Sequence, residues 1–134
     1  FILFFLNNFK QVKGGSLLSS GRPIPDINEN NKREWLNSCL CFSKSSLKFY
    51  EHFDNKGKAF YEDVFTSHNF YQKGYKLLKI NHATIIHNVK DPLSFKEHLY
   101  SLSNQYKIVK KFNKSKILYM LDVLIFSLVF LFYK

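Results

Sequence analysis

Alanine and arginine are nearly absent from this chain of 134 residues, which has two of each. The alanines are Ala59 and Ala83 and the arginines are Arg22 and Arg33, whereas Lys, Asn, Phe and Tyr abound. Arginine makes the better bidentate phosphate contact, so binding alone does not explain the preference for lysine in a basic protein. Residues with A/T-rich codons are favoured over those with G/C-rich codons. This bias indicates an AT-rich gene, and a mitochondrial genome is our first choice.

Cysteine is scarce as well, since Cys39 and Cys41 are the only two. They are too few for a disulfide framework and too close along the chain for an ordinary disulfide, which fits a reducing compartment. With His52 they could offer three metal ligands, but metal sites favour cysteines two to four residues apart and need a fourth ligand. We therefore expect neither a metal site nor a cofactor.

The residue patterns of an enzyme are also missing. His82 and His87 have no Ser, Cys or acidic residue beside them in a nucleophile pattern. The pair at 14–15 lacks the further glycines and the Lys-Ser/Thr of a phosphate-binding loop. Glu62 and Asp63 are adjacent, so a helix or a strand points them apart. We expect no catalytic residues and no enzymatic activity.

Positive charge is abundant and unevenly spread. Lys and Arg total 20 against 10 Asp and Glu, and residues 64–134 hold eleven of the basic groups but only three of the acidic ones. Such a field attracts polyanions, chiefly RNA or an anionic lipid surface, through phosphate contacts and counterion release. The charge by itself does not say which polyanion is bound.

The first half of the chain predicts strands around an exposed arm. Residues 1–9 are apolar and rich in Phe, which favours a buried strand. The Pro-Ile-Pro unit at 23–25 forces an extended backbone, and the polar run 26–33 cannot bury enough apolar area to order itself. The stretches 35–42 and 44–53 are interpreted as the two strands of a hairpin.

The second half predicts helices with basic surfaces. Residues 56–80 carry six aromatic residues, and three lysines at three-residue spacing, Lys73, Lys76 and Lys79, would share one helix face. Asp91 and Pro92 are typical of a helix start, with a helix expected through Tyr106. Five lysines between 107 and 116 then form a basic cluster before an apolar tail.

That apolar tail, residues 117–133, allows two interpretations. It is apolar except for Asp122 and Ser127, and is slightly shorter than the roughly twenty residues that span a bilayer core. Its Leu, Ile, Val and Phe residues could outweigh the cost of one central Asp on an insertion scale, so a membrane anchor is allowed. Alternatively, residues 115–121 end a helix and 123–133 form a buried strand. Periodicity favours neither.

Three short stretches resemble the small-subunit ribosomal protein family S-ten. The Gly-Arg-Pro-Ile-Pro run at 21–25 is similar to the family's Gly-Pro-Ile-Pro signature, which lies on a long hairpin loop that threads into head RNA. Residues 43–51 follow at nearly the family spacing and resemble its Asn-Lys segment, which ends in an aromatic residue and Glu. The end, 117–134, resembles the family's last helix, Leu-Asp turn and final strand. Arg22 is inserted in the signature, and 52–116 is a large insertion.

The resemblance implies an α+β fold with a small sheet and packed helices. One domain, 1–134, would carry a long protruding hairpin loop at 21–51 and an inserted helical extension at 52–116. The implied role is that of a structural constituent of the small ribosomal subunit in the mitochondrial matrix, bound to ribosomal RNA and neighbouring ribosomal proteins. The loop and the basic clusters together give the expected RNA-binding residues: Arg22, Lys32, Arg33, Lys44, Lys48, Lys73, Lys76, Lys79, Lys110 and Lys111.

A second interpretation remains beside the ribosomal one. If residues 117–133 form an anchor, the chain is a C-terminally membrane-anchored accessory subunit of a respiratory or ATP-synthase complex in the mitochondrial inner membrane. In that case the tail, rather than the basic loop, decides where the protein resides.

Overall fold

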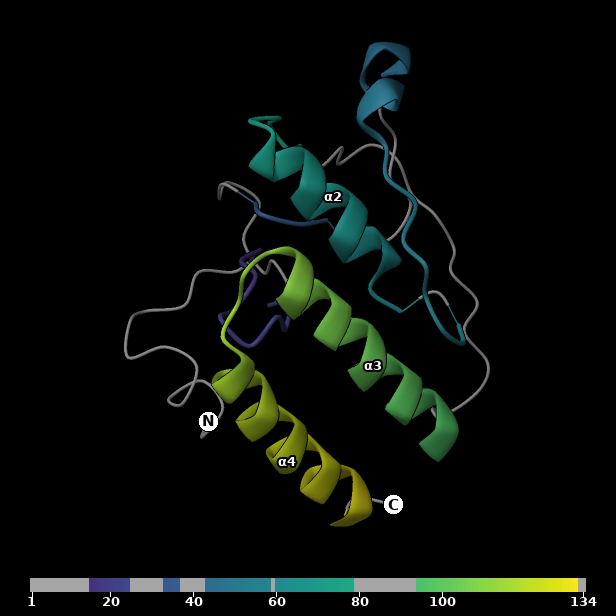
Figure 1. The fold of residues 1–134 in the computed structure, drawn as a ribbon, viewed down its shortest axis with the longest axis vertical. Coiled ribbons are helices and arrows are strands. Elements are labelled where there is room, and N and C mark those ends of the chain that lie inside the picture. The colour runs from purple at the N-terminus through teal and green to yellow at the C-terminus, as the bar shows by residue number, and fades with distance from the viewer. Residues whose placement is uncertain (1–14, 25–32, 37–42, 59, 79–93, 133–134) are drawn as a thin grey trace.

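The computed structural model describes residues 15–24, 33–36, 43–58, 60–78 and 94–132. Figure 1 shows α3 and α4 side by side, α2 beyond α3, and η1 at the end of the molecule far from α4. The helices of these residues are, in chain order, the short 3-10 helix η1 (Lys44–Phe49), α2 (Glu62–Gln72), α3 (Phe95–Lys111) and α4 (Lys116–Phe132).

The predicted small sheet is wrong. Within the described ranges there is no sheet, and the one pairing of extended backbone is an isolated antiparallel bridge between Leu17 and Pro23. Residues 44–49, expected in a hairpin strand, form η1 instead. A local hydrogen bond explains the difference, because the Ser46 hydroxyl donates to the Ser43 carbonyl at 2.7 Å and supports a turn. The strand expected at 1–9 and residues 37–42 of the strand expected at 35–42 lie outside the described residues.

The expected strand at 123–133 is also wrong, because one helix, α4, continues through Phe132. Val, Ile and Phe prefer strands only weakly, and tertiary contacts override such preferences. The contacts here recur at helical spacing along α4, at Tyr119, Asp122, Phe126 and Phe130. No helix in the part of the chain that the structure describes is long and apolar enough to cross a membrane.

The start of α3 is fixed by a capping box. The Ser94 hydroxyl accepts from the Glu97 backbone N–H at 3.2 Å, and Oε2 of Glu97 accepts from the Ser94 backbone N–H at 2.9 Å. The hydrogen bond from the Ser94 backbone is the main cause that lowers the pKa of the Glu97 carboxyl, and Lys58 adds to it. The start predicted at Asp91 and Pro92 lies outside the described residues, and the helix ends at Lys111 rather than at Tyr106.

The hydrophobic core lies between α2, α3 and the segments that precede them. The rings of Phe53 and Phe65 stack at 4.8 Å, and Phe112 closes one side of the cluster 5.8 Å from Phe65. The core thus draws residues from both sides of position 52, so Phe53, Val64, Phe65 and Ile108, which the sequence placed in an insertion, belong to it. Its buried members are Leu17, Trp35, Phe53, Val64, Phe65 and Ile108.

Asn104 on α3 fastens the loop that leads into α2. Its side chain is fully buried, accepts from the Lys56 backbone N–H at 3.0 Å, and donates to the carbonyls of Lys56 at 3.0 Å and Phe60 at 3.2 Å. One amide therefore provides partners for three backbone groups of the loop. This clamp ties the loop that precedes α2 to α3.

Candidate nucleic-acid interface

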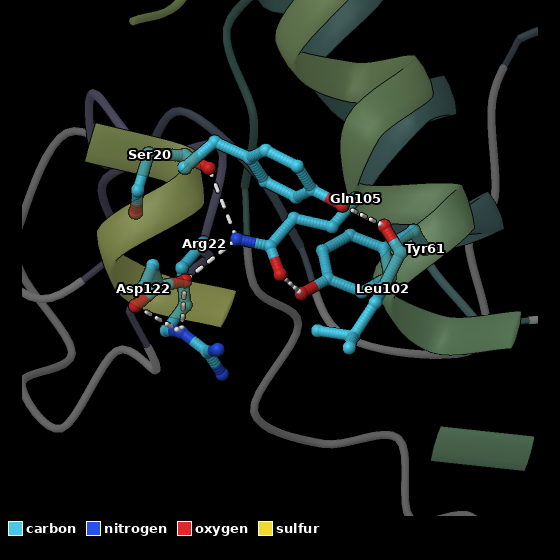
Figure 2. A network of polar contacts seen from close by, with 7 residues as sticks. Ser20, Arg22, Tyr61, Leu102, Gln105 and Asp122 are labelled. Carbon is cyan, nitrogen blue, oxygen red and sulfur yellow. Dashed lines mark hydrogen bonds and ion pairs between the residues drawn. The ribbon is translucent and has the colours of Figure 1, made fainter. Parts of the chain in front are cut away.

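Arg22, expected to bind RNA, is held inside the protein by a network of polar contacts (Figure 2). Its Nε donates to both carboxylate oxygens of Asp122 on α4, at 3.1 and 2.9 Å. The Asp122 side chain is fully buried and that of Arg22 is 21% exposed. The Arg22 guanidinium also lies over the Phe126 ring, 3.2 Å from its centroid. Arg22 therefore joins α4 to the rest of the protein.

Gln105 donates a further hydrogen bond to the buried Asp122 carboxylate. Its Nε2 donates to Oδ2 of Asp122 at 2.7 Å and to the Ser20 carbonyl at 3.0 Å. The Tyr61 hydroxyl donates to Oε1 of Gln105 at 3.3 Å. Burial raises the pKa of Tyr61 far above its usual value, against the opposing effect of Arg22, so the hydroxyl keeps its proton. The network links segment 20–22, the start of α2, α3 and α4.

Gly21 places Arg22 in this network. Its φ is +78°, a left-handed conformation that other residues rarely adopt. A Cβ at this position would lie 2.6 Å from Cγ2 of Val109, which is too close for a real contact. The absent side chain thus lets the turn lie directly on α3. The fold therefore explains the Gly-Arg pair at 21–22, because glycine allows the turn and arginine pairs with Asp122.

Arg33 and Lys32 were also expected to contact RNA. The structure buries Arg33, which is 7% exposed, so its side chain does not extend into solvent as an arm residue would. Lys32 lies outside the described residues. The arm thus contributes less exposed charge than the sequence predicts.

Four of the other expected residues share one end of the molecule, which we call the basic end: Lys44 and Lys48 on η1, and Lys73 and Lys76 just after α2. Figure 1 shows η1 and the last turn of α2 at the end opposite α4. All four lysines are exposed. Lys73 joins the two groups, because its Nζ donates to the Phe49 carbonyl at 3.0 Å. Lys79 lies outside the described residues.

Aromatic rings lie among these lysines. The Nζ atoms of Lys48 and Lys73 are 5.0 and 5.4 Å from the centroid of the Phe49 ring. The Tyr75 ring, 38% exposed, lies 5.8 Å from Phe49. Lysines beside exposed aromatic rings are typical of surfaces that bind single-stranded nucleic acid, where phosphates meet the charges and bases stack on rings. The basic end has this chemistry.

The last two expected residues, Lys110 and Lys111, lie near the end of α3. Lys111 forms an ion pair with Glu51, and the neighbouring Lys107 pairs with Asp54 at 3.3 Å. Lys110 is exposed. Part of the predicted lysine cluster thus compensates acidic side chains of segment 51–54, and its net field is weaker than the sequence suggests.

The candidate metal ligands and acidic residues were also located in the structure. Within the described ranges, no three His, Cys, Asp or Glu side chains gather where they could hold a metal ion. Oδ1 of Asp63 accepts from the Val64 backbone N–H at 2.8 Å at the start of α2, which is a local helix contact. Cys39, Cys41, His82 and His87 lie outside the described residues.

Sequence reasoning missed the role of Asp122 and Gln105. The signal was present, since Asp122 is the single charged residue between Ile117 and Phe132. A lone carboxylate in an apolar helix needs a buried partner. The partner lies 100 positions away, and nothing local in the sequence identifies Arg22 as that partner.

Comparison of the chain with models of known protein families, with curated proteins and with solved structures finds no match.

Proposed function

We propose that this protein is a non-catalytic structural subunit that binds ribosomal RNA through its basic end, within the small ribosomal subunit of a mitochondrion. The observation that carries the proposal is the gathering of Lys48 and Lys73 around Phe49. These lysines lie far apart in the sequence, and their proximity creates one surface from two weak clusters. The codon bias and the net charge of +10 support the same choice of polyanion and compartment.

RNA binding at the basic end does not depend on the fold of the S-ten family. The small sheet and the final strand that the resemblance implied are absent from the described residues. Arg22, which is inserted in the signature run, forms an ion pair with Asp122 of α4. We therefore rest RNA binding on the basic end and keep the ribosomal assignment as the setting that best fits a small basic subunit.

RNA binding is tested by replacing Lys44, Lys48 and Lys73 with Gln and measuring affinity for single-stranded RNA over a range of salt. Removing one phosphate interaction lowers the salt slope by about 0.7, so the triple variant should lower it by about two. A control of equal charge replaces Lys56, Lys58 and Lys96, which lie beside the first half of α3. If both triple variants lower the slope equally, binding is a property of net charge and the basic end is not the site.

The ribosomal setting is tested separately. We expect the chain to sediment with small-subunit RNA through a gradient that contains detergent and high salt. Co-purification with cytochromes or ATP synthase, without RNA, would contradict the setting and favour the accessory-subunit alternative. That alternative draws its support from one observation, the apolar outer surface of α4.

A further inference from the structure

The surface of α4 that faces away from the body is apolar except for the partly buried Ser127 at its edge. Seven side chains on it are exposed by 39% to 82%. With 3.6 residues per turn they fall in one stripe along the helix, on the side opposite Asp122 and Phe126. We call this the outer stripe, and its members are Ile117, Met120, Leu121, Leu124, Leu128, Leu131 and Phe132. Exposing such a surface to water is unfavourable, so we expect the outer stripe to be covered by a protein or a lipid partner.

The start of α3, which packs against α4, also exposes apolar side chains. Phe95 and Leu99 are each 49% exposed, and the Phe95 ring lies 6.2 Å from Phe130 of α4. Figure 1 shows the two helices side by side over their length. The apolar area is therefore broader than a single helix seam.

The outer stripe carries no charged side chain, and exposed lysines lie before its first residue. Asp122 is the single charged residue between Ile117 and Phe132, and its carboxylate is turned inward and paired with Arg22. Lys116 is the exposed first residue of α4, and Lys110 is exposed in the last turn of α3, the helix that precedes it. The covering must therefore accept apolar side chains along the helix and positive charge at its beginning.

We propose that the outer stripe binds the surface of an anionic lipid bilayer, with α4 lying in the plane of the membrane. The 17 residues of α4 extend about 25 Å, enough for the stripe to enter the boundary between headgroups and acyl chains. Lys110 and Lys116 then meet lipid phosphates. This site goes beyond RNA binding and lies at the other end of the molecule.

A lipid surface fits better than a partner helix for two reasons. The seven members of the outer stripe carry no hydroxyl, amide or charged group, and Ser127 at its edge is partly buried, whereas protein interfaces have a polar rim and about one hydrogen bond per 100–200 Å². Paired helices also carry charged residues beside a narrow seam to fix partner and register. Here Met120 and Phe132 widen the seam with further apolar groups. A lipid bilayer requires neither a polar rim nor charged residues beside a narrow seam.

The test is flotation of the full chain with lipid vesicles. One set contains phosphatidylcholine alone and the other adds about a third phosphatidylglycerol, an amount that gives a negative surface potential. We expect flotation with the second set. Replacing Leu124 and Leu128 with Glu should lower the bound fraction about tenfold or more, since each Leu contributes its transfer free energy. Leu47→Glu is the matched control, because Leu47 on η1 is 50% exposed and Leu128 is 46% exposed.

A second pair of variants tests the role of charge. Lys110→Gln with Lys116→Gln should reduce flotation with anionic vesicles more than Lys73→Gln with Lys76→Gln, although both remove two charges. Circular dichroism checks that the helices persist. If the Glu variants lose helix, Leu124→Gln with Leu128→Gln replaces them, since Gln is a good helix former.

Three outcomes would overturn the proposal. The first is no flotation with anionic vesicles, and the second is an equal loss with Leu47→Glu. The third is self-association of the free chain that the Glu variants abolish while vesicles have no effect, which would assign the outer stripe to a second copy. RNA binding by the same variants is measured in parallel, so failure of the lipid proposal and failure of the RNA proposal remain distinguishable.

Discussion

The basic end and the outer stripe of α4 differ in how the protein treats charge. At the basic end, lysines stay exposed and lie around aromatic rings, with Lys73 bound to a backbone carbonyl. Along α4 the single carboxylate is buried, neutralised by Arg22 and hydrogen-bonded by Gln105. The protein leaves charge in water at the basic end and keeps the one charged side chain between Ile117 and Phe132 off the surface of α4. Two surfaces with opposite solvent preferences can therefore serve two different partners.

The two regions also differ in the kind of interaction that stabilises them. Contacts of exposed lysines each contribute little, because water screens them and long side chains lose entropy. A buried pair behaves differently, since removing one partner leaves the other charge in an apolar environment. Substitutions in the two regions should therefore have very different effects on stability.

The largest effect is expected for Arg22→Met, which leaves the Asp122 carboxylate buried without its cation. We expect the free energy of unfolding to fall by about 3 kcal/mol, the lower end for a broken buried pair because Arg22 keeps some exposure. Urea unfolding followed by circular dichroism measures this. The salt slope of RNA binding should remain unchanged, since Arg22 is not part of the basic end.

A double variant separates the ion pair from simple packing. Arg22→Met with Asp122→Leu removes both charges, and we expect it to recover most of the stability that Arg22→Met removes, as apolar replacements of buried pairs generally do. If the double variant is as unstable as Arg22→Met alone, the loss comes from disturbed packing around Phe126. The pair would then not be what fastens α4.

A smaller effect is expected for Asn104→Ala, which breaks the clamp between α3 and the loop at 56–60. Three backbone groups lose their partner at a fully buried position, and we expect a decrease in unfolding free energy of about 2 kcal/mol. Urea unfolding again measures the change. Ser101→Ala, one turn earlier on α3, is the control and should cost less than about 0.5 kcal/mol. Equal decreases would show that the clamp adds nothing specific.

Helices were predictable from the sequence where the signals were local. A helix was expected after Asp91 and Pro92, and α3 covers Phe95–Lys111, with its start fixed by the local capping box of Ser94 and Glu97, which the sequence reasoning did not use. The final strand was predicted wrongly because its β-branched and aromatic residues are also compatible with a helix. Contacts of α4 with α3 and Arg22 stabilise the helical form of this segment. An apolar run of this length does not reveal its period when nearly every position is apolar.

The candidate site was predictable only in part. The sequence supplied the lysines of the basic end but assigned Lys48 and Lys73 to different structural units. Their proximity depends on how the segment after η1 returns along α2, which is a tertiary property. Arg22 was expected to face RNA because a basic residue beside Pro23 looks exposed. Only the fold reveals that Asp122 lies against it.

The smallest effect concerns pH and a histidine that belongs to neither surface. Nδ1 of His68 on α2 donates to the Glu34 carbonyl at 2.9 Å, because a carbonyl can only accept. Nε2, 3.1 Å from the Gln72 amide nitrogen, is therefore the unprotonated acceptor. Burial is the main cause that lowers the pKa of His68 below 6.5, and the contact with Glu34 opposes it. The folded protein thus favours the neutral ring.

The sign of the pH effect follows from this lowered pKa. Well above pH 6.5 the ring is neutral in both the folded and unfolded states, and its contribution to stability is fully present. As pH falls below 6.5 the unfolded chain takes up the proton first, so the free energy of unfolding decreases until the folded pKa is reached. His98, whose pKa is lowered by burial and by Arg22, acts in the same direction. Urea midpoints between about pH 7.5 and 5.5 should therefore decrease, less steeply in His68→Gln than in the parent. A midpoint that rises on acidification would mean that the His68 ring is protonated in the fold, and its contacts with Glu34 and Gln72 would have to be reassigned.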